Sequence, residues 1–460
     1  MELVSHAAAK KLKSNLRGLE LAEPTVIKRL LPADTLYAII RDIGLKYRKR
    51  AYTPVATVWL WLKQRLEPGT ACREVVAGAF ARALVEGQET VSTDCSAYCR
   101  ARGRLPEELV ERACTQVAEQ VDDESDYQAF DRPVHLVDGT TCKTADTEDN
   151  QKEYPQPTSQ KPGCGFPSIR LVGVFSLATG VLRQLAMGAL DKSELALFYT
   201  LWSTLPKNAI LVGDRYFGCF MNVALLLARG VDTVMRVNAS RKVHFGKCHT
   251  RLSKGDALFE WRRPSRCTWL SKRVRLSAPK TLLVRVIRYT IRTPGFRSKT
   301  VLLATTLLDP KAYPAHDLAQ LYGRRWQVEL DIRDIKTTLG MDFINVQSPS
   351  MVRKEVWMHM LCYNLARSIM KHACALTGLA FEEASFKGSL SIITAMADAL
   401  GTRELSPEMY DQMLKGIAQA RLRRRPNRSE PRVIKRRKKD YAIMTQKRRA
   451  KLLKPQLLVA

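Results

Sequence analysis

The chain has 460 residues, enough for about three domains of ordinary size. Hydrophobic residues make up 45% and charged residues 26%, which excludes a wholly disordered chain and a disulfide-stapled miniprotein. Lys and Arg number 75 against 45 Asp and Glu, giving a formal net charge of +30. Because such an excess repels itself unless a polyanion offsets it, it favours nucleic acid first and an anionic membrane surface second.

The sequence predicts neither a membrane span nor a secretory signal. No apolar run approaches the roughly 18 residues of a transmembrane helix, and the N-terminus has no apolar core after its first charges. The eleven cysteines include no Cys-x-x-Cys pair, which argues against a zinc site or a disulfide framework. We therefore expect a protein of a reducing cytoplasm.

Residues 1–125 are predicted to form a helical N-terminal domain. Helix-spaced apolar positions recur over Leu30–Ile43, Pro54–Leu66, Cys72–Leu84 and Pro106–Val121. A basic cluster lies at the end of the first helix and in the segment after it, and comprises Arg41, Lys46, Arg48, Lys49 and Arg50. This cluster is either a solvated helix end or a DNA-contacting surface, and we expect this domain to bind DNA.

Residues 126–238 alternate strands and helices, which predicts an α/β core with a mixed sheet. The expected strands are Val134–Val137, Ile169–Leu177, Val181–Met187, Ile210–Val212 and Val231–Val237. Asp138 and Asp214 follow the first and fourth of these strands, and strand ends are where sites gather in such sheets. Asp191 and Glu194 have the spacing of a capping box and are assigned to a helix cap.

The remaining chain divides into three parts. Residues 239–312 lack helix signals and carry three expected strands, so we predict a β-rich insertion over Leu258–Arg262, Thr281–Thr293 and Thr300–Leu307. Residues 313–400 return to helical texture, and residues 401–460 are expected to form a basic tail. Between Arg421 and Lys454 there are sixteen Lys or Arg and two acids. Such a tail either binds nucleic acid loosely or only aids solubility.

Four polar residues after the insertion are spaced Tyr-x2-Arg-x3-Glu-x6-Lys: Tyr322, Arg325, Glu329 and Lys336. On a single helix they fall within an arc of about 60°. A carboxylate beside two cations and a phenol suits a metal ion next to a phosphate backbone. The alternative is a solvated, salt-bridged helix face.

Asp138 and Asp214 add two carboxylates from neighbouring strands to Glu329. Three carboxylates from three segments can hold two divalent cations, and hard oxygen ligands favour Mg²⁺. Asp146 is a competing acid, but it lies in the polar run from Lys143 to Glu153 and is assigned to a loop or cap.

These segments together resemble the DDE transposases of bacterial insertion sequences, and the last four residues match the Tyr-Arg-Glu-Lys signature of the insertion-sequence-four family. The resemblance covers about residues 130–370. Its parts are Val-Asp138-Gly-Thr, Gly-Asp214-Arg-Tyr and Tyr322/Arg325/Glu329/Lys336, with support from Asp146-Thr147-x-x-Asn150, Gly165-Phe166-Pro167 and Tyr363-Asn364-Leu365.

The resemblance implies a ribonuclease-H-like core, with its first part over 126–238 and its second over 313–400, interrupted by the insertion at 239–312. It implies that Asp138, Asp214 and Glu329 bind two Mg²⁺ ions, for which Mn²⁺ can substitute. The residues implied to contact DNA are Tyr322, Arg325, Lys336 and Arg215. The implied partners are terminal inverted repeats, target DNA and a second copy of the chain on paired ends, in the cytoplasm and nucleoid of a bacterium, with no membrane partner.

The expected function is cleavage at the element's ends and joining of the freed 3′-hydroxyl to target DNA by two-metal-ion phosphoryl transfer. Two alternatives stay open: a transposase-derived DNA-binding protein without cleavage activity, and a related ribonuclease-H-like nuclease. Some relatives pass through a DNA hairpin, which needs an aromatic platform for a flipped base. Trp261 and Trp269 are candidates for it, with packing inside the insertion as the alternative.

Overall fold

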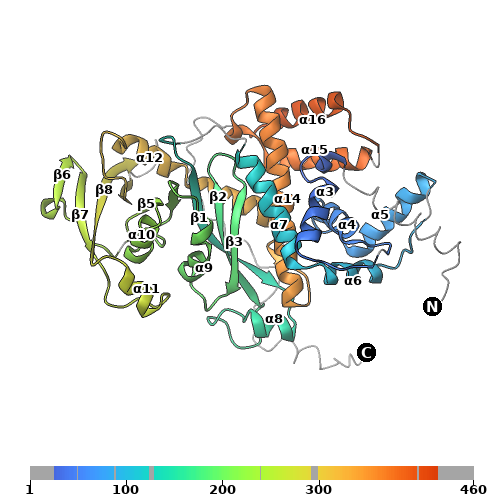
Figure 1. Cartoon of the computed structure of the whole chain (residues 1–460), viewed down its shortest axis with the longest axis horizontal. Coiled ribbons are helices and arrows are strands. Elements are labelled where there is room, and N and C mark those ends of the chain that lie inside the picture. The colour runs from blue at the N-terminus through green and yellow to red at the C-terminus, as the bar shows by residue number, and fades with distance from the viewer. Residues whose placement is uncertain are drawn as a thin grey trace, which may run out of the picture.

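The computed structural model describes residues 25–48, 50–87, 90–123, 129–238, 240–291, 299–400 and 403–422. Helices of the N-terminal region and of the C-terminal part lie at one end of the molecule, a sheet lies in the middle, and further strands extend from it to the other end (Figure 1). The N-terminal helices are α2 (Thr25–Lys28), α3 (Ala33–Asp42), α4 (Pro54–Leu66), α5 (Cys72–Val85), α6 (Ser96–Arg104) and α7 (Glu107–Asp123).

Helix α6 was not predicted from the sequence. Its nine residues carry few large apolar side chains, and its buried positions are Tyr98, Ala101 and Arg102. A buried arginine is invisible to an apolar periodicity, since that pattern counts the residue as polar. The other predicted helices of this region are confirmed, with ends that differ by up to three residues.

The described strands form one ten-stranded sheet in the order β3-β2-β1-β4-β5-β9-β8-β7-β6, with β10 (Phe343–Ile344) beside β1. Its central strands are β1 (Val134–Thr144), β2 (Ser168–Ser176), β3 (Leu182–Ala189), β4 (Ile210–Gly213) and β5 (Asp232–Arg236). β1 is antiparallel to β2 and parallel to β4, and β4 is parallel to β5. This is the mixed sheet that the sequence predicts for the core.

Helices cover both faces of this sheet, and the alternation of side chains along each strand decides which face a residue reaches. Leu136 and Val212 pack on one face, in the cluster that contains residues of α7, α13 and α14. Val137 and Leu211 pack on the opposite face, against α9 (Glu194–Leu201) and α10 (Phe220–Leu227). The short helix α8 (Glu148–Glu153) follows β1.

Strand β1 continues beyond the residue that was predicted to follow it. Asp138 pairs with Gly173 in the middle of the β1–β2 ladder, and the ladder extends to Lys143. The polar residues after Asp138 hid this extension from the sequence, because the partner strand rather than apolar content holds them in place.

The insertion extends the core sheet. It comprises β6 (Thr250–Ser253), β7 (Asp256–Arg262), α11 (Lys272–Ser277), β8 (Thr281–Ile291) and β9 (Lys299–Thr305). β9 pairs antiparallel with β5, with Met235 opposite Ala304. The prediction of strands here is confirmed, but α11 contradicts the expectation that helices are absent; Ser271 caps it by accepting a hydrogen bond from the Val274 amide.

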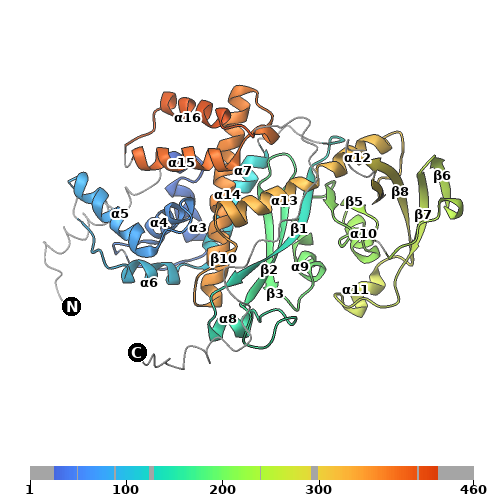
Figure 2. The ribbon, with the colours of Figure 1, turned by 180° about the vertical axis from the view of Figure 1, so that it is seen from behind.

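The helix predicted to carry the Tyr-Arg-Glu-Lys residues is broken into pieces. α12 (Ala315–Gly323) ends before α13 (Trp326–Arg333), and a π-helical turn (Asp334–Thr338) follows. The Arg325 and Gln327 amides bond to carbonyls three residues back, which tightens the chain after Gly323. From behind, α12 and α13 run obliquely across the sheet beside β1 (Figure 2).

The long helix α14 (Pro349–Thr377) is buried along most of its length and ends at Gly378, whose φ of 67° is left-handed. α15 (Phe386–Leu400) and α16 (Pro407–Gln419) pack against it. α16 corrects the prediction that the basic tail begins at 401, because its apolar side, including Tyr410 and Ile417, is buried. The most basic part of that tail, residues 423–460, lies outside the described residues.

The described helices include none that is long and apolar enough to cross a membrane.

Candidate active site

The two aspartates predicted at strand ends lie on neighbouring strands. Val137 pairs with Gly213 in the parallel β1–β4 ladder, so Asp138 and Asp214 follow at adjacent positions. Asp138 shares the sheet face of Leu136, which is the face that α13 covers. The register of two parallel strands therefore brings together residues that are 76 positions apart.

Local hydrogen bonds orient both carboxylates. The Asp214 Oδ1 atom accepts hydrogen bonds from the backbone amides of Tyr216 (2.7 Å) and Phe217 (3.4 Å). The Asp138 Oδ1 atom accepts one from the Gly139 amide at 2.8 Å. The turn after β4 thus fixes Asp214 through its own side chain, a common role of Asp in turns.

Glu329 reaches the same region from α13, which packs against β1. Arg325 links the acids: its Nη2 atom lies 2.5 Å from the Glu329 Oε1 atom, and its Nη1 atom lies 3.8 Å from the Asp138 Oδ2 atom. The break between α12 and α13 places Arg325 at the start of α13, one turn before Glu329. One guanidinium therefore lies between two of the three predicted metal ligands.

The three carboxylates lie within electrostatic reach of one another. The pKa of Asp138 is raised from 3.8 to about 6, mainly by burial and in smaller part by the charges of Asp214 and Glu329, while the Gly139 amide and Arg325 oppose the rise. Burial and the neighbouring acids thus both disfavour the ionised form of Asp138. A bound cation would relieve this repulsion.

These donors suit a divalent metal ion, although their arrangement here is not that of a loaded site. No three His, Cys, Asp or Glu side chains in the described part of the chain lie close enough together to hold a metal ion as they stand. Arg325 pairs with Glu329 and faces Asp138. Carboxylate oxygens are the ligands that Mg²⁺ prefers, so the chemistry of the three acids fits this ion.

Along the chain, Tyr322 precedes Glu329 and Lys336 follows it. The Lys336 Nζ atom donates to the Thr141 carbonyl oxygen of β1 at 2.9 Å and lies 3.0 Å from the Asp342 Oδ1 atom. Tyr322 is 9% exposed, and burial raises the pKa of its phenol. Thus the structure brings these two residues of the predicted signature to the same region as Arg325 and Glu329.

Arg215 directly follows Asp214 and is exposed. Its position puts a further cation at the rim of the same site.

Glu194 is a fourth carboxylate that the sequence analysis assigned to a cap. The cap of α9 is Ser193, whose Oγ atom accepts a hydrogen bond from the Ala196 amide, so the assignment of Asp191 and Glu194 as a capping box is wrong. The Glu194 side chain lies against Gly139, where an added Cβ atom would be 2.6 Å from the Glu194 Cδ atom. Burial and then the charge of Asp214 raise the pKa of Glu194, and Arg170 opposes them.

Two more residues of the site gave no sequence signal of their own. Tyr289 of β8 and Arg236 of β5 lie near Tyr322. The pKa of Tyr289 is raised to about 12, mainly by burial and in part by Tyr322, while Arg236 and Arg325 oppose the rise. Because β8 belongs to the insertion and β5 to the core, only the pairing of both with β9 brings these side chains together.

Asp146 accepts a hydrogen bond from the Gln151 Nε2 atom at 2.8 Å, in the segment between β1 and α8. This contact agrees with the loop role that was predicted for it.

The two candidate base platforms pack within the protein. Trp261 is buried, with the Arg241 guanidinium 4.0 Å from its ring centroid. Trp269 is partly buried and makes edge-to-face contacts with Trp202 and Tyr199. Both side chains therefore have the packing role that was the alternative to base stacking.

Comparison with known proteins gives three similarities. The family profile described as the transposase DDE domain matches residues 129–365. The transposase InsG for insertion sequence element IS4 of Escherichia coli K12 is 26% identical over 361 residues, covering 76% of this chain and 79% of that protein. The putative transposase InsZ of the same strain is 24% identical over 210 residues, covering 43% and 69%.

Among solved structures, a cryo-electron microscopy structure of the piggyBac transposase synaptic complex with hairpin DNA matches with a TM-score of 0.44 and 10% identity, covering 88% of this chain and 86% of that chain. The profile match spans more than half of the sequence and includes Asp138, Asp214 and Glu329. The chain belongs to the family of transposases with a DDE domain, of the type that insertion sequence IS4 encodes.

Proposed function

We propose that this transposase cuts the ends of its insertion sequence and joins the freed 3′-hydroxyl to target DNA, with Asp138, Asp214 and Glu329 as the metal ligands. The observation that carries this proposal is the mutual approach of these three acids from β1, β4 and α13, beside Arg325 and Lys336. Carboxylates alone would repel a phosphate backbone, so the site needs cations to accept DNA.

Two divalent cations, Mg²⁺ or Mn²⁺ in its place, would stabilise the charge on the attacking and leaving oxygens when bound. Asp138 and Asp214 would hold them from the sheet, and Glu329 would complete the set from α13. In the first step, water attacks the phosphorus, the P–O3′ bond breaks, and the 3′-oxygen takes a proton. In the second step, that 3′-hydroxyl attacks a target phosphodiester and releases the target's own 3′-oxygen.

The cations of the chain would act on the DNA. We infer that Arg325 leaves Glu329 and Asp138 for a phosphate oxygen when DNA and metal enter, because charge-assisted bonds to phosphate replace those it gives up. Lys336 donates to the Thr141 carbonyl oxygen and lines one hollow with Asp138, and Arg215 is the exposed residue that follows Asp214. Tyr322 has a phenol suited to donate to the backbone.

We further propose that residues 1–125 bind DNA, that two copies of the chain act on paired ends, and that the segment after α16 adds sequence-independent affinity through its charge. Each role would serve an enzyme that must hold two terminal repeats and a target. The inverted repeats and target DNA are the expected partners.

Replacement of Glu329 by Gln tests the catalytic proposal. Glu329→Gln removes one negative ligand and leaves the surrounding cations, so we expect cleavage in Mg²⁺ to fall at least about 10³-fold while DNA binding is retained. The measurement compares cleavage and gel-shift binding on DNA that carries the sequences flanking the gene.

Glu382→Gln is the matched control, because Glu382 forms an exposed ion pair with Arg324 at the same break between α12 and α13. Full activity of Glu329→Gln would contradict the assignment of this ligand. Binding without cleavage by the unmodified protein would instead favour a DNA-binding protein derived from a transposase, and cleavage without joining would favour a nuclease.

A further inference from the structure

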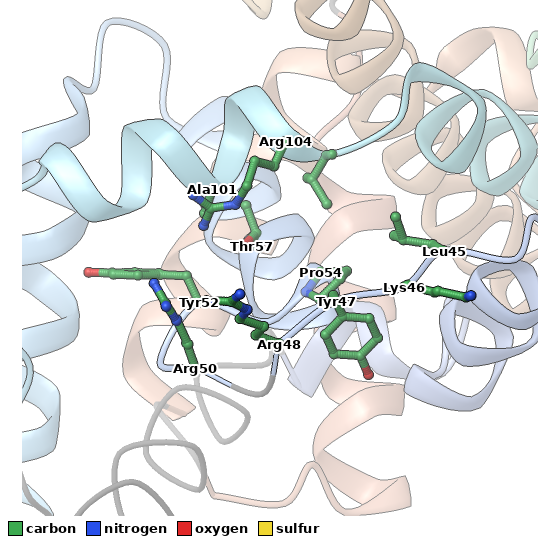
Figure 3. Close-up of a pocket in the computed structure, with 11 residues that line it drawn as sticks. Leu45, Lys46, Tyr47, Arg48, Arg50, Tyr52, Pro54, Thr57, Ala101 and Arg104 are labelled. Carbon is green, nitrogen blue, oxygen red and sulfur yellow. The ribbon is translucent and has the colours of Figure 1, made fainter. Parts of the chain in front are cut away.

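A basic pocket of about 370 Å³ lies between the α3–α4 segment and helix α6. Cationic side chains enter it from both elements: Lys46, Arg48 and Arg50 precede α4, and Arg104 is the last residue of α6. In Figure 3, Arg48, Arg50 and Arg104 extend toward one side of the pocket and Lys46 toward the other. These residues are separate from the strands and the helix that carry the acids of the candidate active site.

The charged residues that line this pocket are all cations. Its lining includes no Asp or Glu, and none of its four cations forms an ion pair with a described carboxylate. All four cationic residues are exposed. Like charges in one concavity repel each other, and an anion that binds among them removes this repulsion.

The lining favours a phosphodiester backbone over a small anion. The volume exceeds that of one phosphate group, and the cations are spread over two elements rather than focused on one point. Arginine forks bind phosphate oxygens in pairs. Tyr47 adds an exposed phenol to the wall, which can pack on sugars or donate to phosphates, and the Tyr52 ring also lines the pocket.

The pocket is tied to the catalytic core through buried charge. Arg102, two residues before Arg104, places its Nη2 atom 2.5 Å from the Glu355 Oε2 atom of α14, and Arg65 of α4 lies 2.8 Å from the other oxygen. The Lys354 Nζ atom donates to the Gly103 carbonyl oxygen at 2.7 Å. Both helices that frame the pocket are therefore fastened to α14.

Helix α14 is in turn fastened to the helix that carries Glu329. Arg367 of α14 forms a buried ion pair with Asp331 of α13, two residues after Glu329. A group held in the pocket would thus keep a constant distance from the catalytic carboxylates, because one continuous helix joins both.

We propose that this pocket binds backbone phosphates of the substrate DNA and so fixes where the DNA end lies relative to the catalytic acids. The inference rests on the proposed function, from which it takes DNA as the substrate, and it adds the second point of contact and its role in register.

The test uses proteins that carry Glu329→Gln, in EDTA, so that binding is measured without cleavage. Arg48→Ala/Arg104→Ala should lower the slope of log K against log salt by about two, since each phosphate contact contributes about 0.9. Arg73→Ala/Arg112→Ala is the control, because it removes two exposed arginines of the same region that do not line the pocket. Its slope should be unchanged.

An unchanged slope in the pocket variant, or an equal fall in the control, would overturn the proposal. The proposal would also be overturned if the pocket variant kept the DNA slope but lost binding to inorganic phosphate or to vesicles of anionic phospholipid. The pocket would then bind one of those anions instead of DNA. All substitutions are at exposed positions, so both variants should unfold at the same temperature as the parent.

Hydroxyl-radical footprinting of the same proteins tests the register. The parent should protect a block of backbone at a constant distance from the end of the terminal repeat, and the pocket variant should lose that block or show it at several positions. Protection that is identical in both proteins would contradict the role in register. Because neither measurement needs cleavage, failure of the catalytic proposal would appear separately, as inactivity of the unmodified protein.

Discussion

Asp138 shows how the surroundings of the site act on a single carboxyl group. It is held in a sheet, half-enclosed, and shares its surroundings with two other acids, so its pKa lies near 6 instead of 3.8. A divalent cation must displace the proton that this environment favours. The chemistry of the site is therefore coupled to pH through one carboxyl group.

This coupling predicts the pH dependence of metal binding. Below about pH 6, Asp138 is mostly protonated in the metal-free protein, so the affinity for Mg²⁺ or Mn²⁺ should fall about fivefold as the pH drops from 6 to 5. Calorimetric titration with Mn²⁺ at several pH values measures this. Asp138→Asn should bind more weakly and lack the step near pH 6.

The raised pKa of Asp138 also makes the free energy of unfolding of the metal-free protein depend on pH. The folded-state pKa of Asp138 is above the unfolded value, so ionising this group disfavours the folded state as the pH rises from about 4 to about 6. Asp138→Asn should remove that part of the pH dependence of the free energy of unfolding. A metal affinity that does not change between pH 7 and 5 would contradict the assignment of Asp138 as a metal ligand.

The sequence predicted the residue types of the site but not how they pair. Asp138, Asp214 and Glu329 were identifiable because each stands in a short motif. The contact of Arg325 with both Glu329 and Asp138, and that of Glu194 with Gly139, depend on the packing of α13 and α9 onto the sheet. Spacing along one chain carries no information on such contacts.

At the scale of elements, the break between α12 and α13 matters most. The sequence predicts one straight helix from Tyr322 to Lys336. On such a helix, the spacing of the four Tyr-Arg-Glu-Lys residues places them on one face. The structure reaches a similar grouping with two helices and a π-helical turn, in which Lys336 bonds to the backbone of β1. Helical periodicity predicted the grouping, while the bend at Gly323 and the polar extension of β1 depend on tertiary contacts.

One buried carboxylate links the N-terminal helices α4 and α6 to α14. Glu355 is 3% exposed and pairs with Arg65 and Arg102, while the Trp61 Nε1 atom donates to it at 3.0 Å. Burial alone would raise its pKa, but the two arginines lower it. Glu355→Gln would leave two guanidinium groups without their countercharge.

We therefore expect Glu355→Gln to lower the free energy of unfolding by about 3–5 kcal/mol, as measured by urea denaturation. Glu108→Gln is the control: it breaks an exposed Glu–Arg pair with Arg112 and should cost at most about 1 kcal/mol. Equal, small effects of both substitutions would show that the buried pair does not hold the helices to α14.

At the scale of the whole molecule, charge is distributed unevenly along the chain. The segment from Arg421 to Lys454 has sixteen Lys or Arg and two acids, while the net charge of the entire chain is +30. The sequence shows this asymmetry directly, and composition alone led to a nucleic-acid partner. The sequence also predicted a mixed sheet with the strands of Asp138 and Asp214 side by side, whereas the full order of the strands and the extension of the sheet by the insertion through β9 did not follow from it.

Removal of residues 423–460 tests the role of this charge. The truncated protein should show a flatter dependence of non-specific DNA affinity on salt, by about 0.9 in the log–log slope for each phosphate that these residues neutralise. Anisotropy with an unrelated duplex measures the slope. An unchanged slope would mean that these residues do not bind DNA.

The transposase activity is tested most directly by cleavage, with the full-length protein, of DNA that includes the sequences flanking its gene, in Mg²⁺, with the cut ends sequenced. We expect breaks at the tips of the inverted repeats that leave 3′-hydroxyls, joining of those ends to added target DNA, and neither product with Glu329→Gln. Specific binding of the repeats with no cleavage in Mg²⁺ or Mn²⁺ would contradict the proposed activity.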